Sequence, residues 1–123
     1  MTNEEIARYC LQKPGAYEDF PFGLTPACYK VCGRIFLQLY PHPEGHRITV
    51  SCERGLAEMY RARFPGDVTP GYHCPDRLKP HMNTVRLNRS VEDALVFAMI
   101  DHSYVRVVSK LTRAKRASLA AQG

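Results

Sequence analysis

Residues 27–40, ACYKVCGRIFLQLY, decide the expected fold because they encode two strands joined by a tight turn. The apolar runs 27–32 and 34–40 flank Gly33. In the second run, Ile35, Leu37 and Leu39 alternate with residues that are polar or aromatic: Arg34, Phe36, Gln38 and Tyr40. Such alternation is typical of strands with one buried face. Lys30 leaves the register open: a two-residue turn places it on the leucine face, and a three-residue loop, which its charge favours, places it on the other.

The rest of the chain supplies helices and further strands around this antiparallel hairpin. Thr2 and Glu5 form a capping-box pattern that predicts an N-terminal helix. We expect residues 16–26 to form a loop whose aromatic side chains fold onto the core, and the Pro- and Gly-rich residues 65–81 to form a long surface loop. The predicted helices span 2–13, 53–64 and 91 to beyond 111, and the further strands span 46–52 and 82–88. The pattern predicts an α+β fold in which helices back an antiparallel sheet.

The last predicted helix has two distinct sides. Ser90 is expected to cap it. Its apolar stripe, expected to face the sheet, consists of Phe97, Ile100, Tyr104, Val107, Val108 and Leu111. The opposite side carries His102, Arg106, Lys110 and Arg113, spaced four, four and three residues apart. Bases about one helical turn apart suit a phosphate backbone, and the same spacing also describes the solvated side of an amphipathic helix.

Length and charge restrict the class of protein. The 123 residues fit one domain, which we place at 1–112, followed by a basic and frayed tail at 113–123. Hydrophobic residues make up 45% of the chain, which excludes a disordered protein. No apolar run reaches the length of a membrane span, and the N-terminus lacks the bases of a signal peptide, so we expect a cytoplasmic protein without membrane contact. The net charge of +5 favours anionic partners, nucleic acid first, or serves solubility.

Cysteines and histidines give no metal or catalytic motif. The five cysteines, an odd number without a secretory signal, are expected to be free thiols. His42 and His46 flank a turn that offers too few ligands for zinc, so no metal or other cofactor is expected. A second group, His73, Cys74 and His81, brackets the long loop. If this loop folds over the last helix, the group and His102 could form a polar pocket with Asp19, Asn83 and Tyr104, in which His102 and Asp19 are a possible acid–base pair. Alternatively, these residues fill and cap the fold. No nucleophile elbow, P-loop or H-E-x-x-H pattern is present, so we expect no enzymatic activity.

Several short motifs together identify a resemblance. The chain resembles the MmcQ/YjbR family of small bacterial proteins from residue 12 to residue 112. The motifs that carry it are Pro14-Gly15-Ala16, Asp19-Phe20-Pro21-Phe22-Gly23, Tyr29-Lys30-Val31-Cys32-Gly33-Arg34-Ile35-Phe36, Pro70-Gly71-Tyr72-His73, His81-Met82-Asn83-Thr84-Val85, Ile100-Asp101-His102-Ser103-Tyr104 and Lys110-Leu111-Thr112. Two features depart from the family pattern: Met82 stands where the family usually has Trp, and the loop at 74–80 is longer than usual.

The resemblance implies a fold and a role. The fold would be frataxin/CyaY-like or secretion-chaperone-like, and the role would be DNA binding of the "double wing" kind without catalysis. The residues that match family motifs, and so become candidate functional positions, are Asp19, Pro21, Phe22, Gly23, Tyr72, His73, His81, Asn83, Thr84, Asp101, His102, Ser103 and Tyr104.

Residue chemistry and resemblance lead to one functional hypothesis and one alternative. We expect weak, largely non-specific DNA binding through phosphate contacts by Lys30, Arg34, Arg47, Arg77, Lys79, Arg106, Lys110 and Arg113. Phe36 and Tyr40 lie between bases in the sequence, as in a platform that stacks single-stranded nucleic acid, or belong to the core under a helix. The alternative is a protein-interaction or small-ligand module that uses the loop at 65–81.

Overall fold

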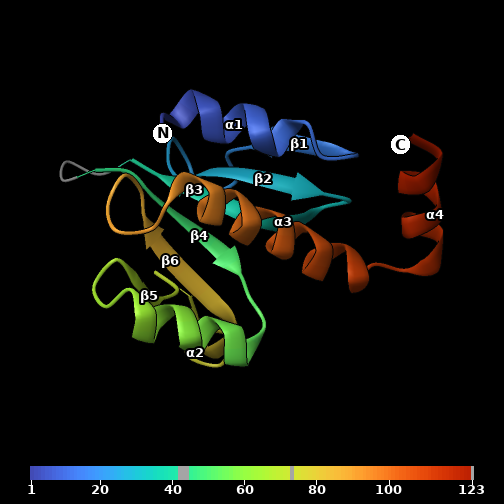
Figure 1. The fold of residues 1–123 in the computed structure, drawn as a ribbon. Coiled ribbons are helices and arrows are strands. Elements are labelled where there is room, and N and C mark those ends of the chain that lie inside the picture. Colours follow the sequence, from blue (N-terminus) through green and yellow to red (C-terminus); the bar gives the residue numbers. More distant parts are fainter. Residues whose placement is uncertain (42–44, 73, 123) are drawn as a thin grey trace.

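The fold of this chain is a six-stranded antiparallel sheet with helices α1, α2 and α3 on one face and α4 beyond the end of α3 (Figure 1). The structure is a computed structural model that describes residues 1–41, 45–72 and 74–122. The strands are β1 (Ala16–Asp19), β2 (Ala27–Val31), β3 (Arg34–Tyr40), β4 (Arg47–Ser51), β5 (Val68–Pro70) and β6 (Met82–Arg86). The helices are α1 (Asn3–Leu11), α2 (Arg54–Arg63), the 3-10 turn η1 (Lys79–His81), α3 (Asp93–Ser109) and α4 (Arg113–Gln122). The strand order is β1-β2-β3-β4-β6-β5, which confirms the predicted α+β class.

The β2–β3 hairpin answers the register question in a way the sequence did not suggest. Cys32 and Gly33 form a two-residue turn with φ of 49° and 82°, as expected of a type I′ turn, so the longer loop is wrong. The pairing register shifts between Tyr29 and Lys30, because β3 contains one extra residue at a bulge. Tyr29 therefore stays on the leucine face, while Lys30 moves to the opposite face despite the short turn.

The core lies between the sheet and the helices. Ile6 of α1 and Ile100 of α3 are fully buried against Leu37, Val50 and Val85 of the sheet. In Figure 1, α3 crosses the middle of the sheet, α1 lies along β1 and β2, and α2 lies beside β5 and β6. Because side chains alternate across a strand, the residues between these apolar positions point to the opposite face. That face carries no helix of the described chain.

The predicted apolar stripe of the last helix is confirmed in part. Ile100, Val107 and Leu111 are buried, whereas Phe97, Tyr104 and Val108 are only partly buried. The buried positions within α3 are Val96, Met99, Ile100, Ser103 and Val107. Phe97 is only partly buried and packs against Tyr9 of α1, with ring centroids 4.3 Å apart. Helix α3 is therefore oriented so that it contacts both the sheet and α1. The periodicity of its apolar residues could not predict the contact with α1. The N-cap of α3 is Glu92; the predicted cap, Ser90, instead donates its hydroxyl to Asp67 at 2.6 Å.

Both predicted loops contain strands. Residues 16–19 form the edge strand β1, and the aromatic side chains that follow do not fold onto the core. Phe20 is 47% exposed and Phe22 64% exposed. The stretch 65–81 contains β5, which pairs with β6, as well as η1. Short edge strands of this kind lack the long alternating pattern on which the sequence prediction relied.

The C-terminal segment is helical rather than frayed. Helix α4 begins at Arg113, and Leu119 on it is buried in the core cluster. Arg116 donates to the carbonyl oxygens of Ser109 and Leu111, which ties α4 to the end of α3. Within the described ranges, no helix has the length and apolar character needed to cross a membrane.

Candidate functional site

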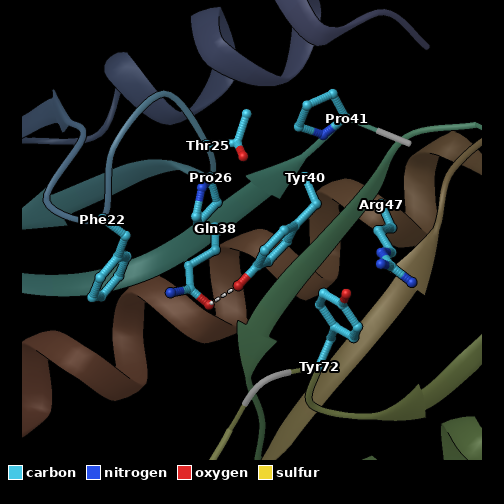
Figure 2. A pocket seen from close by; sticks show the side chains of 8 residues that line it. All are labelled: Phe22, Thr25, Pro26, Gln38, Tyr40, Pro41, Arg47 and Tyr72. Carbon is cyan, nitrogen blue, oxygen red and sulfur yellow. Dashed lines mark hydrogen bonds between the residues drawn. The ribbon is translucent and has the colours of Figure 1, made fainter. Parts of the chain in front are cut away.

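A pocket of about 520 Å³ opens on the face of the sheet opposite α3. Figure 2 shows its side chains in front of β3 and β4, with α3 behind the sheet. The described residues that line it are Phe22, Thr25, Pro26, Gln38, Tyr40, Pro41, Arg47 and Tyr72. This volume lies within the range of about 300–1,000 Å³ that is usual for small-ligand sites, which are also mostly apolar and aromatic. Of these lining residues, Arg47 is the one with a formal charge.

The strongest feature of the pocket is an arginine stacked on an aromatic pair. The Arg47 guanidinium lies 3.8 Å from the centroid of the Tyr72 ring and 6.0 Å from that of Tyr40. The two tyrosine rings meet edge to face, with centroids 5.3 Å apart and an interplanar angle of 88°. Cation–π contacts leave the N–H groups at the guanidinium edge available for hydrogen bonds to an anion or a base.

The lining side chains come from four separate segments: the loop before β2, the end of β3, the start of β4 and the loop after β5. Gln38 and Tyr40 point to the open face because they alternate with the buried Leu37 and Leu39 on β3. The Tyr40 hydroxyl donates to Gln38 Oε1 at 3.3 Å. Burial is the main cause that raises the pKa of Tyr40, so this hydroxyl keeps its proton at neutral pH.

Tyr72 reaches the pocket through a tightly packed loop. Its backbone N–H donates to Thr84 Oγ1 at 2.7 Å, and Thr84 Oγ1 also lies 2.8 Å from Thr49 Oγ1 on β4. A Cβ at the preceding residue, Gly71, would lie 2.6 Å from Cys74 Sγ and 2.8 Å from Met82 Cβ. Glycine at position 71 therefore lets the loop approach β6 closely enough to bring Tyr72 over the sheet.

The predicted basic residues do not form one surface. Arg106 and Lys110 lie at the end of α3, but α3 stops at Ser109, and Arg113 begins α4 instead of continuing the same face. Arg106 donates from Nε to Ser51 Oγ at 3.1 Å. The expected line of four bases on one helix face is therefore broken before Arg113, and phosphate contacts by these bases stay a prediction. Separate elements carry the others: Lys30 on β2, Arg34 on β3, Arg47 on β4, Arg77 before η1 and Lys79 in η1.

Two of these bases already have acidic partners. Lys30 Nζ lies 2.7 Å from Asp19 Oδ2, and Lys79 Nζ lies 2.9 Å from Asp76 Oδ1. The hydrogen bond from Lys30 is the main cause that lowers the pKa of Asp19. Arg34 is exposed at the start of β3, and Arg77 is exposed in the turn before η1. Of the bases predicted to contact phosphate, Arg47 is the one that lines this pocket.

The possible acid–base pair is not assembled. Asp19 is bound to Lys30, whereas His102 Nε2 accepts the backbone N–H of Glu53 at 3.1 Å. Burial, and then the nearby Arg106, lower the pKa of His102. Over residues 1–41, 45–72 and 74–122, no three His, Cys, Asp or Glu side chains come together as metal ligands would. His42 and His73, two of the predicted candidates, lie outside the described residues, while His46 contacts Asn3 at 3.3 Å.

Most residues of the family motifs join elements of the fold. Ser103 on α3 donates to the Phe36 carbonyl at 2.5 Å and accepts from the Ser51 N–H at 2.9 Å. Asp101 accepts the Tyr9 hydroxyl at 2.6 Å and binds Lys13. Further links run from Tyr104 to the Pro14 carbonyl and from Asn83 to α2, through Ala57 and Arg61. Polar motif residues of this kind hold α1, α2 and α3 on the sheet.

The remaining motif residues have varied places. Phe22 and Tyr72 line the pocket. Pro21 and Gly23 form the exposed turn around Phe22, where Gly23 has φ of 115°, and His81 ends η1. Phe36, one of the two aromatics considered for stacking, is 1% exposed and packs against Tyr104, so it belongs to the core. Tyr40, the other, lies in the pocket.

Comparison with known proteins now places the chain. The model of the YjbR family matches residues 11–106. This chain belongs to the YjbR family. It is 29% identical over 116 residues to "Uncharacterized protein YjbR" of Escherichia coli K12, covering 94% of this chain and 95% of that protein. The protein of the same name from Escherichia coli O157:H7 matches with the same figures.

Solved structures agree with this family membership. A crystal structure of a Deinococcus radiodurans protein with a DUF419 domain has a TM-score of 0.88 at 27% identity, over 97% of this chain and 88% of that one. A crystal structure of a Pseudomonas syringae protein has a TM-score of 0.70 at 20% identity, over 84% of this chain and 96% of that one. The second likeness shows the fold alone. The family resemblance expected from the motifs is thus confirmed.

Sequence reasoning missed part of the pocket. Gln38 alternates outward with Tyr40 on the same strand, so the pattern of 34–40 could have identified it. Thr25, Pro26 and Pro41 carried no such signal, because their place in the pocket depends on how two loops fold over the end of the sheet.

Proposed function

We propose that this member of the YjbR family is a cytoplasmic, non-enzymatic protein that binds nucleic acid, DNA first, on the open face of its sheet. The observation that carries the proposal is the Arg47 guanidinium stacked at 3.8 Å on Tyr72 beside Tyr40, in a pocket on that face. Aromatic rings and arginine on a sheet face that carries no helix are side chains with which proteins stack bases and contact phosphates.

Charge supports an anionic ligand. The chain carries a net charge of +5, and Arg47 pairs in register with Arg86 on the neighbouring strand β6. Two arginines directly opposite each other on adjacent strands lie about 5 Å apart at their Cβ atoms and raise the local positive potential. A phosphate group near the pocket would be attracted first by Arg47, because Arg86 also acts on the nearby Asp67 carboxylate, whose pKa it helps to lower. The expected affinity is in the non-specific range of about 10⁻⁴–10⁻⁶ M at physiological salt.

Salt dependence and one substitution test the proposal. Binding of fluorescent single-stranded and duplex DNA should weaken as salt rises, because each phosphate contact releases condensed counterions. Arg47→Gln should weaken binding and reduce the slope of log affinity against log salt by about 0.7–0.9. The matched control is the double change Lys110→Gln, Arg113→Gln, which removes two exposed bases away from the pocket and should change binding less than Arg47→Gln.

Two outcomes contradict this assignment. One is the absence of binding to either DNA at low salt. The other is equal binding by wild type and Arg47→Gln when thermal unfolding shows that the variant is folded.

A second candidate is a small-ligand or protein-interaction module. It is favoured by the position of Tyr72, because this residue brings the 65–81 loop into an aromatic pocket that a neutral ligand could also occupy. Salt-independent binding of an uncharged apolar probe, lost in Tyr72→Ala, would favour this candidate over nucleic acid.

A further inference from the structure

We propose that the pocket on the open face holds one unpaired nucleobase, so that the chain prefers single-stranded nucleic acid to duplex. This inference rests on the proposed function and specifies its ligand. A phosphate backbone lying across the sheet would use Arg47 but would leave a pocket of about 520 Å³ empty. Bases inside a duplex cannot enter a concave site without being unstacked, whereas bases of a single strand can.

The first argument is the arrangement of the rings. Figure 2 shows Gln38 between Phe22 on one side and Tyr40 on the other, with Pro26 above Gln38. The Tyr72 ring, set at 88° to Tyr40 and capped by Arg47, supports Tyr40 from the far side. A flat heterocycle lying over Gln38 would thus have Phe22 on one side and Tyr40 on the other. Stacking of this kind accepts any base, because every base has a π-face.

The exposure of Phe22 is the second argument. Its ring is 64% exposed in the free protein, on a turn that begins where β1 ends. Large apolar side chains that cluster with other apolar groups at the surface commonly mark binding sites. Covering the Phe22 ring with a base would remove this apolar surface from water.

Polar groups provide the third argument. Gln38 already accepts the Tyr40 hydroxyl at Oε1, and its amide nitrogen can donate to a carbonyl oxygen or ring nitrogen at the edge of a base. Arg47 lies at the side of the pocket next to Tyr72, where it can bind the phosphate of the same nucleotide. A neutral proline-rich peptide also fits aromatic grooves, but it offers no anion to Arg47.

The experiment compares three probes by fluorescence anisotropy at low salt. They are an oligothymidine of about a dozen nucleotides, a duplex of equal length, and a single strand of equal length with abasic sites throughout. Wild type should bind the oligothymidine about 5- to 100-fold more tightly than the abasic strand, because the abasic strand retains the phosphates but loses the stacked base. The duplex should also bind more weakly than the oligothymidine.

Phe22→Ala and Phe20→Ala form the matched pair of variants. Both side chains are exposed and both lie in the same turn. Of the two, Phe22 lines the pocket and Phe20 does not. Phe22→Ala should weaken oligothymidine binding by about 5-fold or more and leave abasic-strand binding unchanged, whereas Phe20→Ala should leave both unchanged. Because both side chains are largely outside the core, neither change should prevent folding.

The outcomes separate this inference from the proposed function. Equal binding of duplex and oligothymidine, or equal effects of Phe22→Ala and Phe20→Ala, would overturn the base pocket. If DNA binding in that case still weakened with salt and with Arg47→Gln, the proposed function would stand. Failure of all three probes to bind would overturn both. Tighter binding of a proline-rich peptide that oligothymidine cannot displace would also overturn the base pocket.

Discussion

Single residues show how the fold uses its buried polar groups. His102 is a family-motif residue that could have served acid–base chemistry, yet its Nε2 accepts the backbone N–H of Glu53 at the start of α2. A neutral imidazole is required for this hydrogen bond, because a protonated ring has no acceptor nitrogen. The lowered pKa of His102, caused first by burial and then by Arg106, keeps the ring in that neutral form.

We expect His102 to make stability depend on pH. Because its folded pKa lies below the unfolded value of about 6.5, the unfolded state binds the extra proton more readily. The stabilisation is therefore fully present above about pH 6.5 and is lost as pH falls through the folded pKa. Urea unfolding at about pH 7.5 and about pH 5 should show a larger loss of free energy for wild type than for His102→Gln, which keeps an acceptor that does not titrate. Equal losses would contradict this role.

At the scale of elements, α3 is the helix that covers the middle of the sheet. It contacts β3 and β4 through its buried side and α1 through Phe97 and Tyr9. The bulge in the β2–β3 hairpin completes this packing, because it keeps both Phe36 and Leu37 buried beneath the helices. The same bulge places Lys30 on the open face, where it meets Asp19.

Substitutions along α3 should follow burial in the structure. Ile100 is fully buried, so Ile100→Ala should lower the free energy of unfolding by about 2–5 kcal/mol. Phe97→Ala should cost less than the roughly 3–5 kcal/mol typical of a fully buried aromatic, because Phe97 is only partly buried. Leu24, which is 94% exposed, provides a control whose change to Ala should stay within about 0.5 kcal/mol. Chemical denaturation measures all three, and a cost below about 1 kcal/mol for Ile100→Ala would show that α3 was misplaced.

The whole molecule has helices on one sheet face and loops over part of the other, and its thiols lie largely inside. Cys10, Cys28 and Cys52 are buried, and Cys32 and Cys74 are partly buried; none forms a disulfide. Burial raises the pKa of Cys10 to about 12 and also raises the pKa of Cys28 and Cys52. Buried thiols with raised pKa values react slowly because the thiolate is the reactive form.

Thiol labelling should therefore report unfolding of the whole domain. Fresh, unreduced protein in denaturant should give all five thiols. In the native state, Cys10 should be labelled only as fast as the protein unfolds, whereas Cys32, which is partly exposed, should be labelled sooner. Mass spectrometry of labelled peptides distinguishes the two sites. Three or fewer thiols in denaturant, or Cys10 labelling as fast as Cys32, would contradict this picture.

The sequence by itself determined the class of fold, the family and most of the elements. The capping box at Thr2, the alternating strands and the long apolar helix are local patterns, and each is set by chain neighbours whose spacing the sequence displays. The tertiary structure decided how these elements meet: the bulge beside Lys30, the rotation of α3 toward α1, and the helix at 113–122. It also decided the site, because Phe22, Tyr40 and Tyr72 are far apart in the chain and converge only when two loops close over the sheet. Such convergence depends on long-range packing, which leaves no periodic signal in the sequence.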